Sequence, residues 1–173
     1  MPLLPIIIAP DRRLKVVCKP VERVDPAVRR LMDDLLATMY AAPGIGLAAP
    51  QIGAERRVIV LDVAGKDAAP QPFRLANPVI VAHSTELVVM SEGCLSLPEI
   101  YLEIARPASV RVRYLDQDDK TREIDASGLL SRCLQHEIDH LDGILAVDHV
   151  SALKRNMILR KLAKQRKIAA DNA

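Results

Sequence analysis

The sequence is poor in aromatic residues: its 173 residues include no tryptophan, one phenylalanine and three tyrosines. Half of the residues are nevertheless hydrophobic, so any core must be built from Val, Ile, Leu and Ala side chains. A chain of this length can bury one core of useful size and is short for two domains. These features predict a single domain with an aliphatic core.

Long apolar runs and an even set of cysteines are also missing. No stretch is long enough to span a bilayer as a helix. Residues 1–8 are apolar, but prolines interrupt them and no basic residue leads them, so they make a poor signal peptide. Three cysteines, an odd number, argue against a disulfide framework and fit a reducing compartment. We therefore expect a cytoplasmic protein.

The net charge of +2 is unevenly distributed. Residues 151–173 contain seven lysines and arginines and one acid, whereas the first 150 residues carry 17 basic and 21 acidic side chains. The positive charge therefore belongs to the C-terminal segment. This asymmetry divides the chain into a main domain, 1–150, and a basic C-terminal helix and tail, 151–173.

The hydrophobic periodicity predicts helices at both ends of the chain and strands between them. Apolar residues at helical spacing predict helices over 26–41, from about 128 to 141, and over 151–168. Strands are expected at 57–63, 76–81, 85–91, 101–105, 109–115 and 121–126. Segment 11–24 is expected to be extended, and 64–72 to be a loop. This order predicts an α+β fold, with antiparallel or mixed sheets around the helix that ends near residue 141.

That central helix contains the pattern H-E-x-x-H, formed by His136, Glu137 and His140. Residues four apart lie on the same face of a helix, one turn from each other. Two imidazoles in this arrangement can share a metal ion, and Glu137 lies beside them to handle the proton of a bound water. The pattern predicts a metal-dependent hydrolase without naming its substrate.

Two histidines make a weak metal site, and catalytic sites of this kind usually have three protein ligands. In one group of metallopeptidases the third ligand is a downstream glutamate, but no glutamate follows Glu137. In another group the motif extends to H-E-x-x-H-x-x-G-x-x-H, but the last position is Ala146. Neither peptidase pattern fits this sequence.

Cysteine is the other type of residue that could supply the third ligand. Cys133 precedes His136 on the same helical face, but its α-carbon would lie about 10 Å along the axis from that of His140. Cys18 lies in an extended stretch without other metal-binding residues. Cys94 lies at the end of a predicted strand, next to a glycine that permits a sharp bend. Considered without the rest of the chain, Cys94 could simply pack in the core. The presence of the histidine motif favours a role for Cys94 as a metal ligand.

Three segments together resemble the signature motifs of peptide deformylase, in the order of that family. They are Gly-Ile-Gly-Leu-Ala-Ala-Pro-Gln at 44–51, Glu-Gly-Cys-Leu-Ser at 92–96 and His-Glu-Ile-Asp-His at 136–140. The resemblance extends over essentially the whole chain and includes the helical C-terminus of the type 1 bacterial form. It implies a metal-dependent enzyme that removes the N-formyl group from the N-terminal formylmethionine of new polypeptides and releases formate.

The resemblance implies three protein ligands for one divalent metal ion: Cys94, His136 and His140. Fe(2+) is the ion expected in this family, and the ligand types also suit Zn(2+), Ni(2+) or Co(2+). Glu137 would accept the proton of a water molecule and deliver it to the leaving amine. The side-chain amide of Gln51 and the backbone N–H of Leu95 would bind the oxyanion that forms on attack.

The resemblance also implies a substrate site around the metal. Glu92 would support the metal site by contacting a metal ligand without binding the metal itself, and Gly46 would let the substrate backbone approach. The expected pocket for the methionine side chain is formed by Ile45, Leu129, Cys133 and the helix face near His136. Many members of the family carry an arginine where this chain has Tyr101, which leaves the peptide preference open.

The basic C-terminal segment has two interpretations. It is either a solvated helix face whose cations favour the helix dipole, or a docking surface for ribosomal RNA or protein. The expected partners are formylmethionyl nascent chains, with possible ribosome contact through this helix; no membrane and no DNA partner is expected, and the protein is expected to be a monomer.

Two other functions stay open from the residues alone. One is another H-E-x-x-H amidase or peptidase, which would cleave internal peptide bonds and use a third ligand other than Cys94. The other is a non-enzymatic, ribosome-associated binding module. Such a module would have no need for Glu137 beside two histidines, so the intact motif argues against it.

Overall fold

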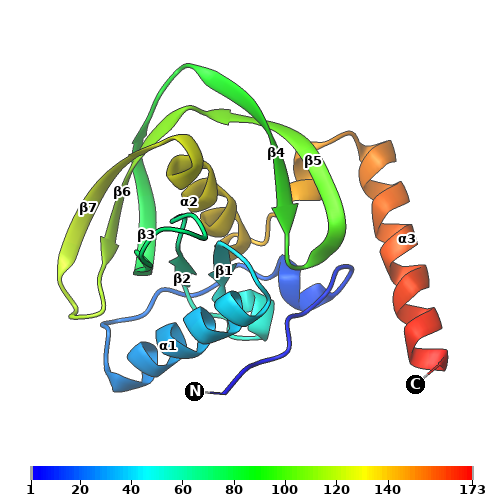
Figure 1. Cartoon of the computed structure of the whole chain (residues 1–173), viewed down its shortest axis with the longest axis horizontal. Helices are drawn as coiled ribbons and strands as arrows, with labels where there is room; N and C mark the ends of the chain where they lie inside the picture. The colour runs from blue at the N-terminus through cyan, green and yellow to red at the C-terminus, as the bar shows by residue number, and fades with distance from the viewer. Residues whose placement is uncertain (1, 173) are drawn as a thin grey trace.

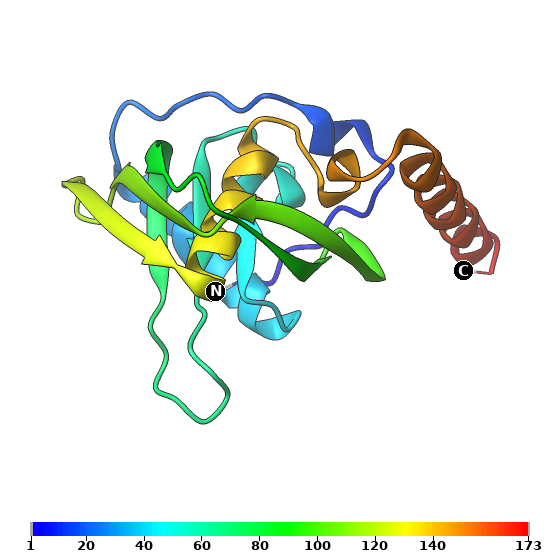
Figure 2. The ribbon, with the colours of Figure 1, turned by 90° about the horizontal axis from the view of Figure 1, so that it is seen from above.

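The computed structural model describes residues 2–172 and places one helix, α2 (Gly128–Leu141), at the centre of two β-sheets. Helix α1 (Pro26–Ala41) lies at the edge of the molecule near the start of the chain (Figure 1). Helix α3 (Ala152–Asp171) extends along the opposite side, as Figure 2 also shows. The site-bearing helix is therefore enclosed, whereas α3 is peripheral.

The larger sheet has five strands in the order β1-β2-β3-β6-β7. Its strands are β1 (Gly46–Ala48), β2 (Val58–Leu61), β3 (Phe73–His83), β6 (Ser109–Leu115) and β7 (Thr121–Ser127). The smaller sheet pairs β4 (Leu87–Cys94) with β5 (Leu97–Pro107). Every strand pair in both sheets is antiparallel. The α+β class with sheets around a central helix is confirmed.

Local sequence signals set the ends of the helices. The Asp25 side chain accepts a hydrogen bond from the backbone N–H of Val28 at 2.9 Å, which caps the start of α1. Gly143 follows the end of α2 with φ +72°, and a β-carbon there would lie 2.5 Å from the carbonyl oxygen of Lys15. Only glycine fits that position, because both the conformation and the close approach exclude a side chain.

Three aliphatic clusters make up the core. One lies between α2 and the larger sheet and contains Leu134, Ile138 and Leu141. A second joins α1 to the other side of that sheet, and a third joins the N-terminal segment, β5 and α3. Helix α3 contributes one fully buried side chain, Leu162, to the third cluster.

Several predicted boundaries need correction. Strand β6 was predicted at its observed bounds, but β5 extends well beyond the predicted 101–105, and β4 continues past 91 to Cys94. Segment 11–24 is not wholly extended, because a 3₁₀ helix forms at Arg12–Lys15, where Asp11 accepts a hydrogen bond from Arg13 N–H. Strand β1 was not predicted. Within residues 2–172, no helix combines the length and the apolar character needed to cross a membrane.

Candidate metal centre and active site

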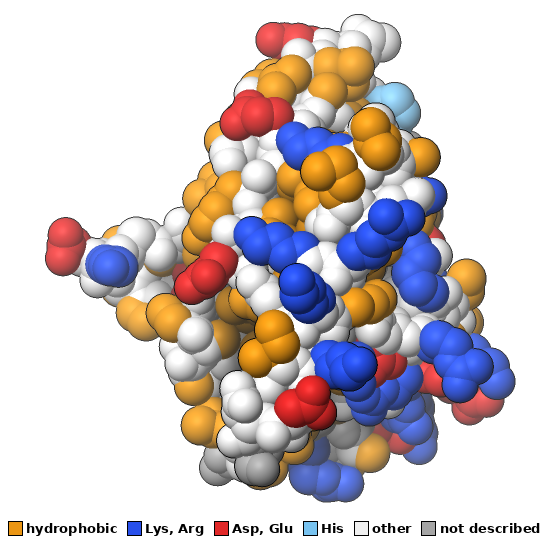
Figure 3. All heavy atoms as spheres, turned by 90° about the vertical axis from the view of Figure 1, so that its right-hand side faces the viewer, with side chains coloured by type: hydrophobic (Ala, Val, Ile, Leu, Met, Phe, Trp, Pro, Cys, Tyr) orange, Lys and Arg blue, Asp and Glu red, His pale blue; other side chains and the backbone are white. Residues whose placement is uncertain are grey.

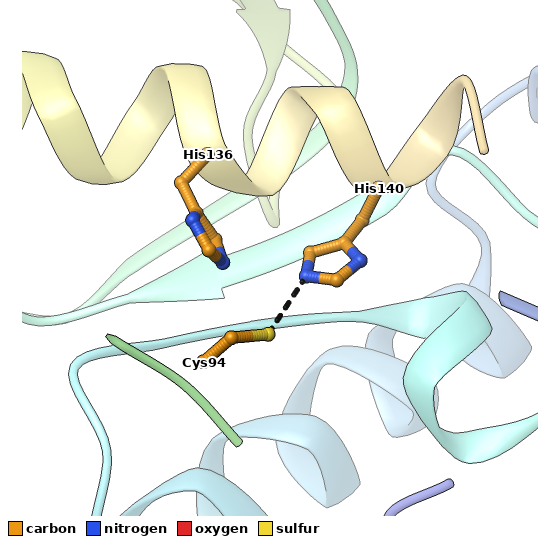
Figure 4. Close-up of side chains that lie close together, drawn as sticks. All are labelled: Cys94, His136 and His140. Carbon is orange, nitrogen blue, oxygen red and sulfur yellow. Dashed lines mark hydrogen bonds between the residues drawn. The ribbon is translucent and has the colours of Figure 1, made fainter. Parts of the chain in front are cut away.

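Helix α2 presents two histidines toward the smaller sheet. His136 and His140 lie one turn apart, with ring centroids 5.1 Å apart and ring planes inclined by 71°. Both side chains are buried, and Figure 4 shows both rings pointing away from the helix toward Cys94. The helical spacing thus places two nitrogen ligands side by side.

Cys94 reaches the histidines from the end of β4. The pairing of β4 with β5 changes register between Gly93 and Cys94, so Cys94 lies opposite Leu97 at the tip of the hairpin. Such an irregularity redirects a side chain at a strand end. The Sγ atom of Cys94 lies 3.4 Å from Nε2 of His140 (Figure 4).

One ligand atom from each of Cys94, His136 and His140 lies within 4.8 Å of the others. A soft thiolate and two imidazoles form a donor set that suits a first-row divalent transition metal. Cys94 is 42 residues before His136 in the sequence, yet its side chain converges with those of the two histidines on one point. The residues present therefore fit a metal ion.

The two histidines differ in their protonation. Nδ1 of His136 lies 2.9 Å from Oε1 of Glu92, and because a carboxylate can only accept, the proton belongs on Nδ1 and Nε2 faces the other ligands. Burial lowers the pKa of His140 well below its ordinary value, so this imidazole is neutral. Burial alone would lower the pKa of His136, but its contacts with Cys94 and Glu92 outweigh burial and raise that pKa well above the ordinary value. Since neutral nitrogen is the form that coordinates a metal, a metal ion at this site would displace a proton from His136.

Glu137 lies beside this cluster with its carboxylate fully enclosed. Burial raises the pKa of Glu137 to about 7, which is the range that suits a group that both accepts and returns a proton. Its Oε2 atom is buried and has no hydrogen-bond partner among residues 2–172. A methyl group at Gly46 would lie 2.6 Å from Oε1 of Glu137, so only glycine leaves room for this carboxylate.

Glu92 is held by four N–H donors. Besides His136, Arg106 donates to both carboxylate oxygens at 2.5 and 2.9 Å, and Arg132 donates to Oε2 at 2.5 Å. Burial alone would raise the pKa of Glu92, but the hydrogen bonds from His136 and Arg106 outweigh it and lower the pKa to about 2. Glu92 therefore stays ionised and fixes the orientation of His136.

Sequence reasoning missed both arginines of this group. Arg106 also donates to Asp139 at 2.9 Å, and Asp139 lies 2.8 Å from Nε2 of His149. Charged residues within a strand or a helix are normally read as exposed, and nothing local in the sequence distinguishes Arg106 or Arg132. A signal did exist in Glu92, because a buried acid requires a cation as a partner.

Gln51 is fixed beside Cys94 by two hydrogen bonds. Its Oε1 accepts from the backbone N–H of Ala48 at 2.9 Å, and its Nε2 donates to Oγ of Ser96 at 3.0 Å. The same Nε2 lies 3.8 Å from Sγ of Cys94. The amide therefore presents its N–H groups toward the metal cluster, and Leu95 follows Cys94 in the turn between β4 and β5.

The cluster opens onto a cavity of about 790 Å³. All five residues predicted to contact substrate line it: Ile45, Gly46, Glu92, Leu129 and Cys133. Ile45 and Leu129 are nearly half exposed at its walls, and Tyr101 is exposed at its rim. The structure adds the N-terminal segment to the lining, through Leu3 and Leu4, which was not predicted.

The other two cysteines lie apart from the ligand cluster. The Cys133 thiol is buried beneath Gly46 and contacts the backbone oxygen of Ile45 at 3.6 Å. Burial raises its pKa well above the ordinary value, which disfavours the thiolate that would bind a metal. Cys18 packs in the core between α2 and the larger sheet.

A thiol, two imidazoles and a buried carboxylate beside a largely apolar cavity define a metal-dependent hydrolase of the H-E-x-x-H class. Comparison with known proteins narrows this class. Residues 3–156 match the family model described as polypeptide deformylase, and the chain therefore belongs to that family. It is an enzyme that removes the N-formyl group from newly synthesised peptides, and it is a metalloenzyme.

Relatives and solved structures agree over nearly the full length. The peptide deformylase of Methylocella silvestris is 59% identical over 173 residues, covering 98% of this chain and 88% of that protein. That of Mesorhizobium japonicum is 54% identical, covering 100% of this chain and 97% of the relative. The crystal structure of peptide deformylase from Ehrlichia chaffeensis has a TM-score of 0.92 at 39% identity, covering 98% of this chain and 99% of that one. A structure of the Ehrlichia chaffeensis enzyme in complex with actinonin has a TM-score of 0.89 at 41% identity, covering 95% and 98% of the two chains.

Proposed function

We propose that Cys94, His136 and His140 bind the divalent metal of this deformylase and that Glu137 carries the proton during the reaction. One observation carries the proposal: the ligand atoms of the three residues lie within 4.8 Å of one another, beside a buried carboxylate whose pKa is raised to about 7. A site built for structure alone would have no use for an acid of that strength next to the ligands.

We further propose Fe(2+) as the native ion, with Zn(2+), Ni(2+) or Co(2+) as substitutes. One thiolate and two imidazoles suit all four ions, so the choice of Fe(2+) rests on the family resemblance. When bound, the ion would supply a Lewis acid that lowers the pKa of a water molecule toward neutrality. Glu92 supports this role, since its bond to Nδ1 of His136 leaves Nε2 free to coordinate.

The chain's own groups then carry the remaining steps. Glu137 accepts a proton from a water molecule as the water oxygen attacks the formyl carbon. It later gives the proton to the amine nitrogen as the C–N bond breaks. The products are formate and a free N-terminus. The Nε2 amide of Gln51 and the backbone N–H of Leu95 bind the oxyanion, and the fixed orientation of Gln51 means that it need not reorganise.

The cavity supports a binding site for the methionine side chain. Ile45, Leu129 and Cys133 supply apolar walls close to Glu137, and Gly46 leaves space for the peptide backbone. An unbranched thioether side chain fits such an irregular apolar surface well. The small formyl group then lies beside Gly46 and Glu137, which approach each other closely.

Formate release is the direct test of the metal assignment. Protein purified anaerobically with Fe(2+) or Ni(2+) should release formate from formyl-Met-Ala-Ser, and chelation should abolish the activity until the metal is returned. An acetyl-Met-Ala-Ser control should be cleaved far more slowly. Metal-loaded protein that releases no formate but cuts internal peptide bonds would instead indicate an H-E-x-x-H peptidase.

We propose that α3 contacts the ribosome. Figure 3 shows lysine and arginine side chains gathered on the face of the molecule that α3 forms. Leu153 and Met157 are also exposed there, at 74% and 62%, so cations and apolar groups share one surface. A ribosome-bound monomer would meet formylated chains as they emerge, and the three free cysteines fit the reducing cytoplasm.

Charge removal on α3 tests this contact. Lys161→Ala with Lys164→Ala should weaken binding to purified ribosomes by roughly tenfold and reduce its salt dependence, because fewer counterions are released. The matched control removes two exposed lysines of the main domain, Lys66→Ala with Lys120→Ala, and should bind as the unmodified protein does. Equal losses in both variants would show that the contact is not specific to α3.

A further inference from the structure

The metal ligands come from two parts of the molecule that no strand pairing joins. His136 and His140 are on α2, whereas Cys94 ends β4 in the two-stranded sheet. The described strands of this sheet pair only with each other and not with the five-stranded sheet that packs on α2. Side-chain contacts must therefore fix the distance between Cys94 and the histidines.

Arg132 makes contacts across this junction at three points. It lies on α2 one turn before His136, and its guanidinium donates to the backbone oxygen of Val88 at 2.6 Å and to that of Ile104 at 2.9 Å. It also donates to Oε2 of Glu92 at 2.5 Å. One side chain of the helix thus holds β4 at two places and β5 at a third.

The positions of these contacts relate directly to the cysteine. Glu92 and Val88 lie two and six residues before Cys94 on the same strand. The contact through Glu92 is shared with His136, because the same carboxylate accepts from Nδ1 of that ligand. Arg132 therefore touches the strand that ends in the thiol ligand and the carboxylate that orients an imidazole ligand.

The guanidinium of Arg132 is also buried at this junction. Its side chain is 6% exposed and that of Glu92 is 5% exposed, so solvent does not replace the contacts. Arg106 crosses the same junction from the other side, from β5 to Asp139 on α2. The two arginines are balanced by two acids, Glu92 and Asp139, which is how a buried group of charges is tolerated.

We propose that Arg132 is a positioning residue that sets the separation between the cysteine-bearing strand and the histidine-bearing helix, and thereby the geometry of the metal site. The inference rests on the proposed ligand set. It assigns Arg132 no contact with the reacting atoms. Loss of the guanidinium frees β4 to shift relative to α2, and the thiol, at the end of that strand, moves most.

Cobalt tests the geometry without an activity assay. Thiolate bound to Co(2+) gives a charge-transfer absorption that reports the sulfur ligand directly. Arg132→Met keeps a long apolar stem and should show a weaker band per bound cobalt. Its affinity for cobalt, measured by competition with a chelator, should fall roughly 10- to 100-fold, the size typical of lost support behind a metal ligand.

A matched control distinguishes positioning from general loss of stability. Arg57 donates to the backbone oxygen of Leu141 at the end of α2 and to Asp142, so it contacts the same helix but not the smaller sheet. Arg57→Met should retain the band and the affinity. Equal losses in Arg57→Met and Arg132→Met, or an unchanged band and affinity in Arg132→Met, would overturn the proposal.

Two further arms keep the test decisive. If the unmodified protein shows no band that Cys94→Ala removes, the proposed ligand set is wrong, and the role of Arg132 fails with it. If Arg132→Met does not fold, Arg132→Lys takes its place: the single ammonium keeps the charge but cannot span Val88, Ile104 and Glu92. An intermediate band and affinity would support the proposal, and values equal to those of the unmodified protein would overturn it.

Discussion

Glu137→Gln should keep the metal and lose nearly all deformylase activity. The amide has almost the size of the carboxylate, so it fits the space beside Gly46, but it cannot accept a proton from water. Loss of a general acid–base typically costs a factor of about 10² to 10⁴ in rate. We therefore expect kcat for formyl-Met-Ala-Ser to fall at least a hundredfold, with one metal ion per chain retained. The measurements are formate release and metal analysis of the same sample.

A matched variant controls for the change in charge. Glu103 is an exposed residue of β5 that does not line the cavity, and Glu103→Gln removes the same charge. Its activity should equal that of the unmodified protein. If Glu137→Gln instead loses its metal, the carboxylate holds the site together and is not the proton carrier. Glu137→Ala should behave as Glu137→Gln does, because neither side chain can take the proton.

The pKa values of the two glutamates in the site are shifted in opposite directions. Burial destabilises the charged form of the Glu137 carboxylate, and its pKa rises to about 7 as a result. Glu92, only a short distance away, has the opposite shift, to about 2, since four N–H donors stabilise its charge. Two glutamates in one site thus take different roles: one stays ionised to orient His136, and the other can exchange a proton near neutral pH.

How far the sequence predicts this fold depends on whether local pattern or tertiary contact sets an element. Strand β6 was predicted at its observed bounds because Val110 and Val112 alternate with exposed arginines. Strand β1 was missed because a glycine-rich stretch has little β propensity, and Gly46–Ala48 becomes a strand only by pairing with β2. The start of β5 was missed because Pro98 and Glu99 interrupt the strand pattern in the sequence; in the structure Glu99 has φ +63°.

The residues of the site also differ in whether a local pattern or a tertiary contact determines their position. The helical spacing of His136 and His140 can be read directly from the sequence, because one element sets it. The residue that completes the cluster lies on another element, and Cys94 was indicated only by comparing the three cysteines with the histidine motif and by the resemblance to a family. Arg106 and Arg132 had no such signal. Their role follows from which strands pack on α2, and that depends on the whole fold.

Cys94→Ala should abolish metal binding, whereas Cys133→Ala should leave it intact. Both changes remove one thiol from the lining of the same cavity, so the comparison separates the position of the thiol from its chemistry. The Cys94 thiol lies 3.4 Å from Nε2 of His140, and removing it leaves two nitrogen ligands, which hold a divalent ion weakly. The Cys133 thiol contacts the backbone oxygen of Ile45 and belongs to the core. We expect Cys94→Ala to be purified without metal and inactive.

Cys133→Ala should show a different kind of change. Removing a buried sulfur leaves a small cavity, so the free energy of unfolding should fall by about 1 to 2 kcal/mol, measured by urea denaturation. Because Cys133 also lines the substrate cavity, KM should rise more than kcat falls, with a full complement of metal. If Cys133→Ala lost its metal and Cys94→Ala did not, the third ligand would be Cys133 on α2 and not Cys94. Such a result would require the helix to distort, because a regular helix places Cys133 and His140 about 10 Å apart along its axis.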